Sequence, residues 1–173
     1  EVLFVELKKL GFNELRNTLI NIIYDDEGYI INYDFSDLLG ASTTSLEYNS
    51  HPVIDNFLKQ IRKTKDAFAE IPLIGKELED WKKQRTSNGE ADDKQLEKTD
   101  SLYYYFYSIG NGGIGISTFS SIDKDKLNIL KRFRNVFDFA YRRYLDITLA
   151  QEQAREAQIE AALERVRSRS MAM

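Results

Sequence analysis

The 173-residue sequence predicts an α+β fold, in which an antiparallel sheet carries helices on one face and a long helix ends the chain. Three observations support this prediction. Two pairs of segments rich in β-branched and aromatic residues have the pattern of hairpins. Apolar residues recur at helical spacing around them, and no Pro or Gly follows Asp123. We therefore expect a globular domain over residues 1–122 and a long terminal helix over residues 123–173.

The N-terminal segment predicts a helix and then a hairpin. Glu1–Leu10 keeps its apolar residues on one helical face, and Gly11 suits the end of a helix. No capping residue stands at its start, so we expect this helix to continue a longer one. Leu15–Tyr24 and Tyr29–Phe35 are strand-like and are joined by a turn that ends in Gly28. In the second strand we expect burial of the face that carries Tyr29, Ile31, Tyr33 and Phe35.

The middle of the sequence predicts a loop, a helix and an edge strand. Ser36–Ser50 is small and polar, which is typical of a loop. Pro52 suits the first position of a helix, and the apolar stripe that follows comprises Ile54, Phe57, Leu58 and Ile61. Phe68–Leu73 has the pattern of an edge strand, because Pro72 cannot donate a ladder hydrogen bond.

A second hairpin is predicted after a charged stretch. Lys76–Arg85 has the pattern of a short helix, and Thr86–Asp100 that of a loop which serves as a lid or is a mobile insertion. Ser101–Ile109 and Gly115–Ser121 are strand-like and flank a glycine-rich turn. Gly110–Gly115 also matches the G-x-G-x-x-G spacing of a dinucleotide-binding loop. Because a strand pattern follows it rather than a helix, a hairpin turn is the favoured interpretation.

The final helix is longer than a small domain needs. At 1.5 Å per residue it would extend roughly 75 Å, so its far half must find a partner. A heptad register places Leu145, Leu149, Glu152, Glu156, Ile159, Leu163, Val166, Ser170 and Met173 at its a and d positions. The polar members weaken the seam and predict a marginal parallel coiled coil that can shift between two packings. The expected dimer seam comprises Phe137, Tyr144, Leu145, Leu149, Ile159, Leu163 and Val166; a solvated helical tail is the alternative.

Composition excludes several classes of function. A net charge of −4 argues against a nucleic-acid partner. The absence of cysteine excludes disulfides, thiolate nucleophiles and Cys-based metal sites, and the single histidine, His51, leaves little for a histidine-rich one. No apolar run approaches the roughly 18 residues that cross a bilayer. We therefore expect a cytoplasmic chain with no membrane contact, no metal and no evident cofactor.

Candidate ligand-binding residues come from the aromatic strand and two single residues. Tyr103, Tyr105 and Tyr107 share one face of that strand, while Tyr104 and Phe106 share the other. Either set could line a cavity while the other enters the core, since tyrosine offers an apolar body with a hydroxyl group. The residues predicted to contact a ligand are Tyr33, His51, Trp81, Tyr103, Tyr105 and Tyr107. For Trp81, anchoring a lid and lying in a surface patch are both open.

Catalysis receives little support from the sequence. The acidic pairs Asp25-Asp26 and Asp92-Asp93 fall in turns, where aspartate is favoured for local backbone reasons. No serine or threonine stands in a nucleophile-elbow context, and no ATP-binding signature is recognisable. His51 precedes Pro52, which biases it away from the helical backbone of a phospho-acceptor histidine. We therefore expect no enzyme activity from this chain; a small enzyme acting on a nucleotide is a minor alternative.

The C-terminal segment carries a family resemblance. Residues 154–173, AREAQIEAALERVRSRSMAM, closely resemble the linker helix of a group of bacterial sensor histidine kinases with GAF-like sensor domains. Residues 1–12, the His51-Pro52-Val53 segment, the aromatic strand and residues 130–133 are more loosely similar to the GAF-like module of that family. The cyclic-nucleotide motif of some GAF domains is not recognisable here.

The resemblance implies a sheet of about five antiparallel strands, with a ligand-sized cavity on one face and terminal helices on the other that pair in a homodimer. It also implies a histidine kinase as the parent protein, in a two-component system. We therefore expect a non-catalytic GAF-like input domain that relays the signal of an unknown small-molecule effector or partner. The downstream kinase or further sensor modules would lie in the same chain. The alternative is a purely structural dimerisation module without a ligand.

Overall fold

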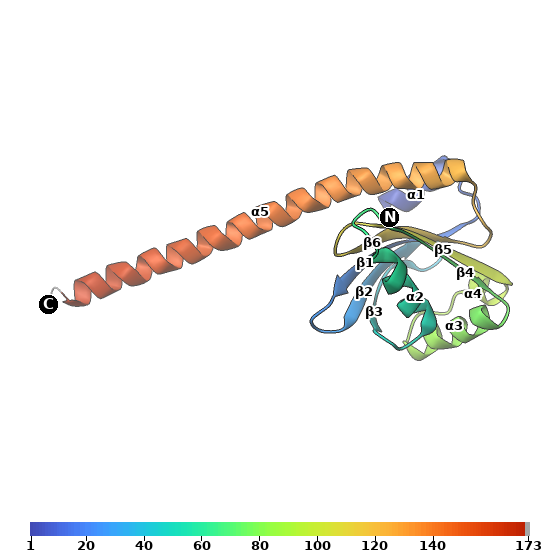
Figure 1. Ribbon diagram of the computed structural model, residues 1–173, viewed down its shortest axis with the longest axis horizontal. Helices are drawn as coiled ribbons and strands as arrows, with labels where there is room; N and C mark the ends of the chain where they lie inside the picture. Colours follow the sequence, from blue (N-terminus) through green and yellow to red (C-terminus); the bar gives the residue numbers. More distant parts are fainter. Residues whose placement is uncertain (172–173) are drawn as a thin grey trace. The chain divides into compact units, whose positions relative to one another are not determined.

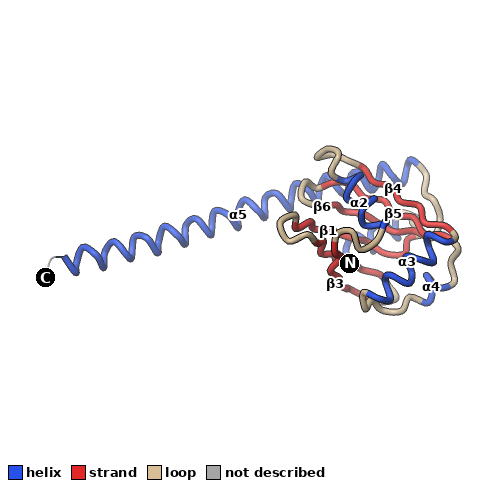
Figure 2. The backbone as a smooth tube through the Cα atoms, turned by 60° about the horizontal axis from the view of Figure 1, so that its bottom comes forward, coloured by secondary structure: helices blue, strands red, loops and turns tan. Residues whose placement is uncertain are grey.

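The computed structural model describes residues 1–171; Met173, the last of the predicted a and d positions, lies outside them. It confirms an α+β fold built on an antiparallel sheet, with six strands in the order β3-β2-β1-β6-β5-β4 rather than about five (Figures 1 and 2). The strands are β1 (Leu15–Tyr24), β2 (Tyr29–Ser36), β3 (Gly40–Glu47), β4 (Phe68–Ile74), β5 (Ser101–Ser108) and β6 (Gly112–Thr118). The helices are α1 (Val2–Lys9), α2 (Pro52–Ile61), α3 (Lys76–Ser87), α4 (Lys94–Glu97) and α5 (Lys124–Met171).

Helices cover both faces of the sheet, not one face as the sequence suggested. On one face, α1 and the first turns of α5 pack over a cluster formed by Phe4, Leu7, Phe12, Leu15, Tyr105, Ile116 and Leu130 (Figure 1). On the other face, α2 and α3 pack over Leu19, Ile30, Ile71, Leu102, Tyr104 and Phe106. Strand β5 explains why both faces carry helices. Its bulky aromatic side chains point to both faces of the sheet, and helices on each face remove them from water.

The first hairpin forms as predicted, but the opposite face of β2 is buried. Tyr24 pairs with Tyr29 across the turn, and the two strands run antiparallel from there. Ile30 and Asn32 are buried under α2 and its neighbours, whereas Tyr33 is 44% exposed. The prediction was wrong because both faces of this strand carry apolar residues. On the predicted face, Phe35 packs against the ring of Phe4, whereas Tyr29 stacks on Tyr24, which is itself 37% exposed.

Strand β3 was missed by the sequence analysis, which predicted a loop over Ser36–Ser50. It pairs with β2 along its whole length, from Tyr29↔Glu47 to Ser36↔Gly40. Its small serine and threonine residues lack the alternation of a half-buried strand because only Leu46 is buried. It is an edge strand whose backbone hydrogen bonds, rather than a buried side-chain face, hold it in the sheet.

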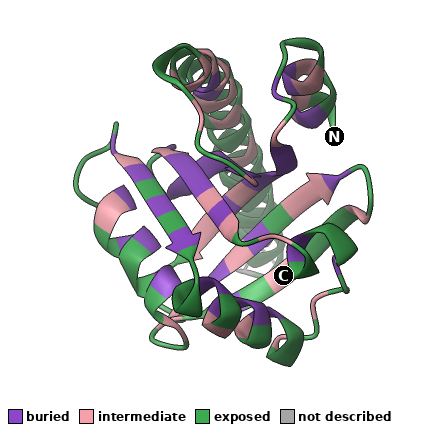
Figure 3. Cartoon of the chain, turned by 90° about the vertical axis from the view of Figure 1, so that its right-hand side faces the viewer, coloured by how far each residue is buried: buried purple, intermediate pink, exposed green. Residues whose placement is uncertain are grey.

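Several local predictions are confirmed. Helix α2 begins at Pro52, and the ring of His51 caps it by accepting a hydrogen bond from the N–H of Val53 at 3.2 Å. Strand β4 is the other edge of the sheet, with Pro72 inside it. Its alternation of buried and exposed residues is visible in Figure 3. The charged stretch after α3 contains α4, which the sequence did not predict.

The long helix α5 runs for 48 residues, about 72 Å at 1.5 Å per residue. The Asp123 carboxylate caps its start by accepting a hydrogen bond from the N–H of Lys126 at 2.8 Å. Leu130 is fully buried against the sheet, and Arg134 donates hydrogen bonds to the carbonyls of Ser108 and Lys65. The globular unit therefore spans Glu1–Arg134, twelve residues beyond the predicted domain of residues 1–122.

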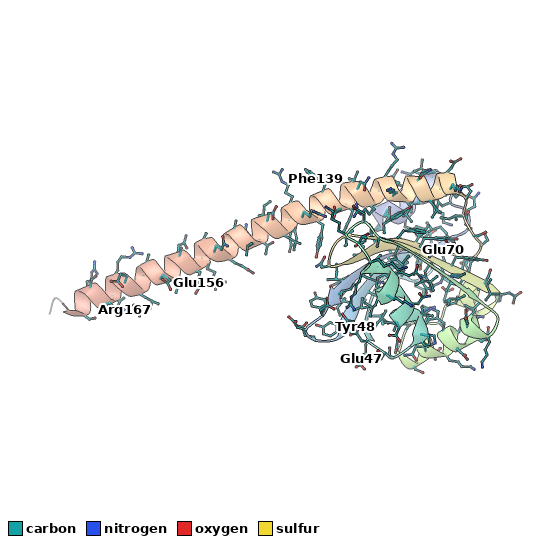
Figure 4. All side chains as sticks on the ribbon, viewed as in Figure 1. Glu47, Tyr48, Glu70, Phe139, Glu156 and Arg167 are labelled. Carbon is teal, nitrogen blue, oxygen red and sulfur yellow. The ribbon has the colours of Figure 1, made fainter. Side chains whose placement is uncertain are left out.

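The second unit begins at Asn135 and consists of the remainder of α5. Its large apolar side chains are mostly exposed, and the predicted seam residues Tyr144, Leu145, Leu149, Ile159, Leu163 and Val166 are among them. Phe137 is half-buried and stacks on Tyr141, with ring centroids 5.7 Å apart. Figure 4 shows Phe139, Glu156 and Arg167 projecting from this helix. Pairing with a second copy stays a prediction.

In residues 1–171, no helix is both long and apolar enough to span a bilayer.

Candidate functional site

A cavity of about 50 Å³ lies in the globular unit, on the face of the sheet that α2 and α3 cover. Its apolar wall comprises Leu19, Ile30, Leu46, Val53, Ile54, Phe57, Ile71 and Phe106. Its polar and amphipathic lining comprises Arg16, Asn17, Asn21, Asn32, Asp34, Trp81, Arg85, Glu90 and Tyr104. Polar groups from four elements thus converge inside a mostly apolar site, which is the usual composition of a small-molecule pocket.

Small residues on the central strand leave room for this cavity. Gly113, Gly115 and Ser117 lie at alternate positions of β6 on the cavity side. A Cβ added at Gly113 would lie 3.3 Å from the ring of Phe57. That ring packs edge-on against the ring of Phe106, with 4.8 Å between the two centroids. Of the glycines of the G-x-G-x-x-G match, Gly112 and Gly115 lie in β6, and Gly110 lies in the turn before it with a φ of +93°. A strand and not a helix follows this turn, in agreement with the hairpin interpretation.

A β-bulge turns Arg16 toward the cavity. Leu15 pairs with Thr118 and Asn17 pairs with Ser117, so β1 contains one residue more than β6 at this point. The extra residue breaks the alternation of faces, and Arg16 and Asn17 both line the cavity. The hydroxyl of Ser117 donates a hydrogen bond to the Asn17 amide oxygen and accepts one from Arg16 Nη1.

Two buried ion pairs fix the guanidinium groups. Arg16 Nε lies 2.8 Å from the Asp93 carboxylate, and Arg85 Nε lies 2.8 Å from that of Glu90. Burial alone would raise the pKa of Asp93, but the Arg16 charge and the N–H groups of Leu96 and Gln95 lower it from its ordinary value. Burial likewise opposes the charge of Arg85, yet the oxygen of Tyr104 and the Glu90 carboxylate raise its pKa. The Asp93 carboxylate and the Arg85 guanidinium are therefore both held in their charged forms, each beside a partner of opposite charge.

Two asparagine side chains in the cavity wall have unpaired oxygens. Asn21 and Asn32 face each other across β1 and β2, and they are only 5% and 6% exposed. Neither amide oxygen has a hydrogen-bond partner among residues 1–171. The orientation of Asn32 is fixed because its Nδ2 donates to the Asp34 carboxylate at 3.2 Å, and a carboxylate can only accept. Buried polar groups without partners are rare and mark sites where a partner is expected.

Trp81 and His51 form an aromatic group beside the cavity. Trp81 Nε1 donates a hydrogen bond to the Tyr104 hydroxyl at 3.0 Å, and the ring centroids of His51 and Trp81 are 5.0 Å apart. His51 lines a neighbouring groove of about 210 Å³ together with Pro72 and Asp80. The structure thus brings these two predicted site residues into contact, with Trp81 in the cavity wall and His51 next to it.

The other predicted ligand-binding residues lie elsewhere. Tyr103, Tyr105 and Tyr107 pack on the opposite face of the sheet, among the residues that α1 and α5 cover, and Tyr33 is exposed. It is Tyr104 and Phe106, the alternative set of the aromatic strand, that line the cavity. Burial raises the pKa of both Tyr105 and Tyr107, as expected for hydroxyl groups held in an apolar layer.

Sequence analysis missed the polar part of the cavity. The signal that could have found it is the placement of Asn17, Asn21 and Asn32 inside strands that are otherwise rich in apolar residues. Asparagine is depleted in strands and costly to bury, so its recurrence on strands expected to be buried indicates a purpose other than packing.

His51 should make stability pH-dependent, because burial lowers its pKa although Asp80 and Asp55 partly oppose this. A lowered folded-state pKa contributes stability that is present above the unfolded value, about 6.5, and lost as pH falls through the folded value. We expect urea unfolding to show lower stability at about pH 5 than at about pH 7. His51→Asn, which keeps a capping side chain, should remove this difference. An unchanged pH dependence in that variant would contradict the assignment, since His51 is the single histidine.

Two carboxylates at this site are held in ion pairs. Among residues 1–171, no group of three or more His, Cys, Asp or Glu side chains could hold a metal ion. The carboxylates of Glu90 and Asp93 are engaged by guanidinium groups, which leaves them poor proton acceptors.

Comparison of the chain with models of protein families, with curated proteins and with solved structures found no match.

Proposed function

We propose that this chain is a non-catalytic, GAF-like input domain of a bacterial two-component sensor histidine kinase. In this proposal the cavity receives a small effector, the chain forms a homodimer through its terminal helices, and α5 relays the change to a downstream kinase. The observation that carries the proposal is the pair of unpaired amide oxygens of Asn21 and Asn32 in the cavity wall. Each unsatisfied buried polar group costs about 1–3 kcal/mol, a penalty that a bound ligand would relieve.

The sheet offers a route between the cavity and α5 within the globular unit. Ser117 contacts the cavity residues Arg16 and Asn17. The preceding residue of β6, Ile116, points to the other face of the sheet, where it packs in one cluster with Leu130 of α5. A shift of β6 caused by a ligand would therefore act on the first turns of α5. A coupling of about 1–3 kcal/mol is enough to change an equilibrium five- to 150-fold.

Replacing Asn21 by Val is expected to stabilise the protein by about 1–2 kcal/mol, because it removes an unpaired oxygen and adds a residue that favours strands. Chemical unfolding of both proteins measures this change. Ser45→Val is the matched control, since this exposed position on β3 offers the strand preference without the buried amide. A destabilised Asn21→Val variant would show that the amide serves the fold, and the proposal would lose its main support.

Dimerisation is tested by native mass spectrometry of the purified chain, which reports subunit number and any co-purified small molecule together. We expect a dimer that Leu149→Glu with Leu163→Glu converts to monomer, because a charge at a seam position is costly to bury against a partner helix. Glu160→Lys with Glu164→Lys serves as a charge-changing control, because neither residue stands at an a or d position of the predicted seam. A wild-type monomer at high concentration would exclude the relay.

A purely structural dimerisation module is the second candidate. The observation in its favour is the size of the cavity, about 50 Å³, against a few hundred Å³ for ordinary ligand pockets. The two candidates differ in the mass experiment, because a structural module gives a dimer without any associated small molecule. They also differ in signalling, since cavity variants would leave the output of a structural module unchanged.

A further inference from the structure

We infer that the cavity selects a small organic ammonium ion. This inference rests on the proposed function, because it names the chemical class of the effector. The starting point is the charge of the lining. Two guanidinium groups, Arg16 and Arg85, are each paired with a carboxylate, Asp93 and Glu90 respectively. Asp34 is the third carboxylate of this group, and no Lys, Arg or His in residues 1–171 pairs with it.

The unpaired polar atoms around Asp34 are acceptors. Asn32 donates its amide nitrogen to Asp34, so the amide oxygen of Asn32 is left available for a donor. Asn21 stands opposite Asn32 in the β1–β2 register and contributes a second unpaired amide oxygen. The Asn32 oxygen is held in place by the bond from its amide nitrogen to Asp34, and the Asn21 oxygen can turn toward a donor in the cavity because the terminal torsion of asparagine is broad. An ammonium group, with three donors and no acceptor, complements two amide oxygens and a carboxylate.

The remaining wall suits the apolar part of such an ion. Phe57, Trp81, Tyr104 and Phe106 line the cavity, and their ring faces attract a cation as well as an alkyl chain. The volume of about 50 Å³ corresponds to about three to five water-sized units, so the ligand is of the size of propylammonium. Asp34 is half-buried, which places the charged group where the cavity meets solvent.

The test uses Trp81, the single tryptophan of the chain, as an intrinsic fluorescence reporter in the cavity wall. The full chain is titrated at neutral pH and constant ionic strength with n-propylammonium, 1-propanol, propionate and potassium. We expect saturable binding of n-propylammonium at least about tenfold tighter than that of each other probe. Tighter binding of propionate, which would pair with Arg85, or equal binding of 1-propanol or potassium would overturn the inference.

Variants locate the effect at the carboxylate. Asp34→Asn keeps the shape of the side chain and should remove at least about tenfold of the propylammonium affinity and the preference over 1-propanol. Asp37→Asn, which removes the same charge from an exposed turn position, should bind like the wild type. Asn21→Val, which leaves Asp34 in place, provides a second variant and should also weaken binding. Equal loss in Asp34→Asn and Asp37→Asn would attribute the preference to net charge and contradict the site.

The two proposals fail in different ways. If propionate or 1-propanol is the preferred probe, the ammonium inference is wrong while the cavity still binds a ligand, and the sensory proposal stands. If no probe changes the Trp81 fluorescence, the ammonium inference is again wrong, and the sensory proposal is then decided by the dimer and co-purified molecule in the mass experiment.

Discussion

Replacement of Asp93 by Asn is expected to lower the free energy of unfolding by about 3–5 kcal/mol, the usual result of leaving a buried charge unpaired. The side chain of Arg16 is only 4% exposed, and the Asp93 carboxylate is the only charged partner that the described residues offer it. Asp93 also caps α4, because its carboxylate accepts hydrogen bonds from the N–H groups of Gln95 and Leu96. Asparagine can accept the same bonds, so the variant removes the charge while it keeps the cap. Equilibrium urea unfolding monitored by Trp81 fluorescence measures the change.

Two controls separate this effect from general acidity and from local structure. Asp92→Asn removes the same charge from the exposed neighbouring position and should change stability by less than about 0.5 kcal/mol. The double variant Arg16→Met with Asp93→Asn removes both charges of this pair and should be more stable than Asp93→Asn alone. If the single and double variants were equally unstable, the loss would come from the packing of α4 and not from the ion pair.

The same pair predicts a pH dependence at acid pH. Because the folded-state pKa of Asp93 is lowered, its contribution is present above the unfolded value, about 3.9, and is lost as pH falls through the folded value. The wild type should therefore lose stability below about pH 4 more steeply than Asp93→Asn, in which this carboxyl group is absent.

The elements that the sequence predicted well are those with strong local signals. Pro52 and the apolar stripe after it define α2, and Pro72 confines its strand to the edge of the sheet. The absence of Pro and Gly after Asp123 predicts one uninterrupted helix, and α5 begins one residue later. Each of these signals depends on the backbone of a few neighbouring residues, which the sequence displays directly.

The cavity could not be predicted in the same way because its residues come together only in the folded sheet. Arg16 and Asp93 are 77 positions apart, and the bulge that turns Arg16 inward depends on pairing with β6. The choice between Tyr104 and Tyr105 as a cavity residue depends on which helices cover which face. A strand with aromatic residues on both faces does not reveal that choice. The sequence does show asparagine residues within strands that are otherwise apolar, and this signal of the cavity was not recognised.

Replacement of Gly115 by Ala is expected to destabilise the protein by about 3 kcal/mol or more, although its backbone angles are open to any residue. A Cβ at this position would lie 2.2 Å from the carbonyl oxygen of Tyr105 and 2.5 Å from the ring of Phe106. The oxygen belongs to the ladder between β5 and β6, so it cannot move away without separating the two strands. The thermal midpoint and the urea midpoint of the variant measure the effect.

Gly113→Ala is the matched control on the same strand and the same face. Its Cβ would meet only the side chains of Phe57 and Ile61, at 3.3 to 3.4 Å, and these can yield by a few tenths of an ångström. We expect a change of less than about 1 kcal/mol, because a reduced entropy of the unfolded chain offsets the close contact. Comparable losses at both positions would mean that β6 tolerates no added volume anywhere. In that case the glycines would serve the packing of the aromatic cover as a whole, and the approach of Tyr105 to Gly115 would not be the limiting contact.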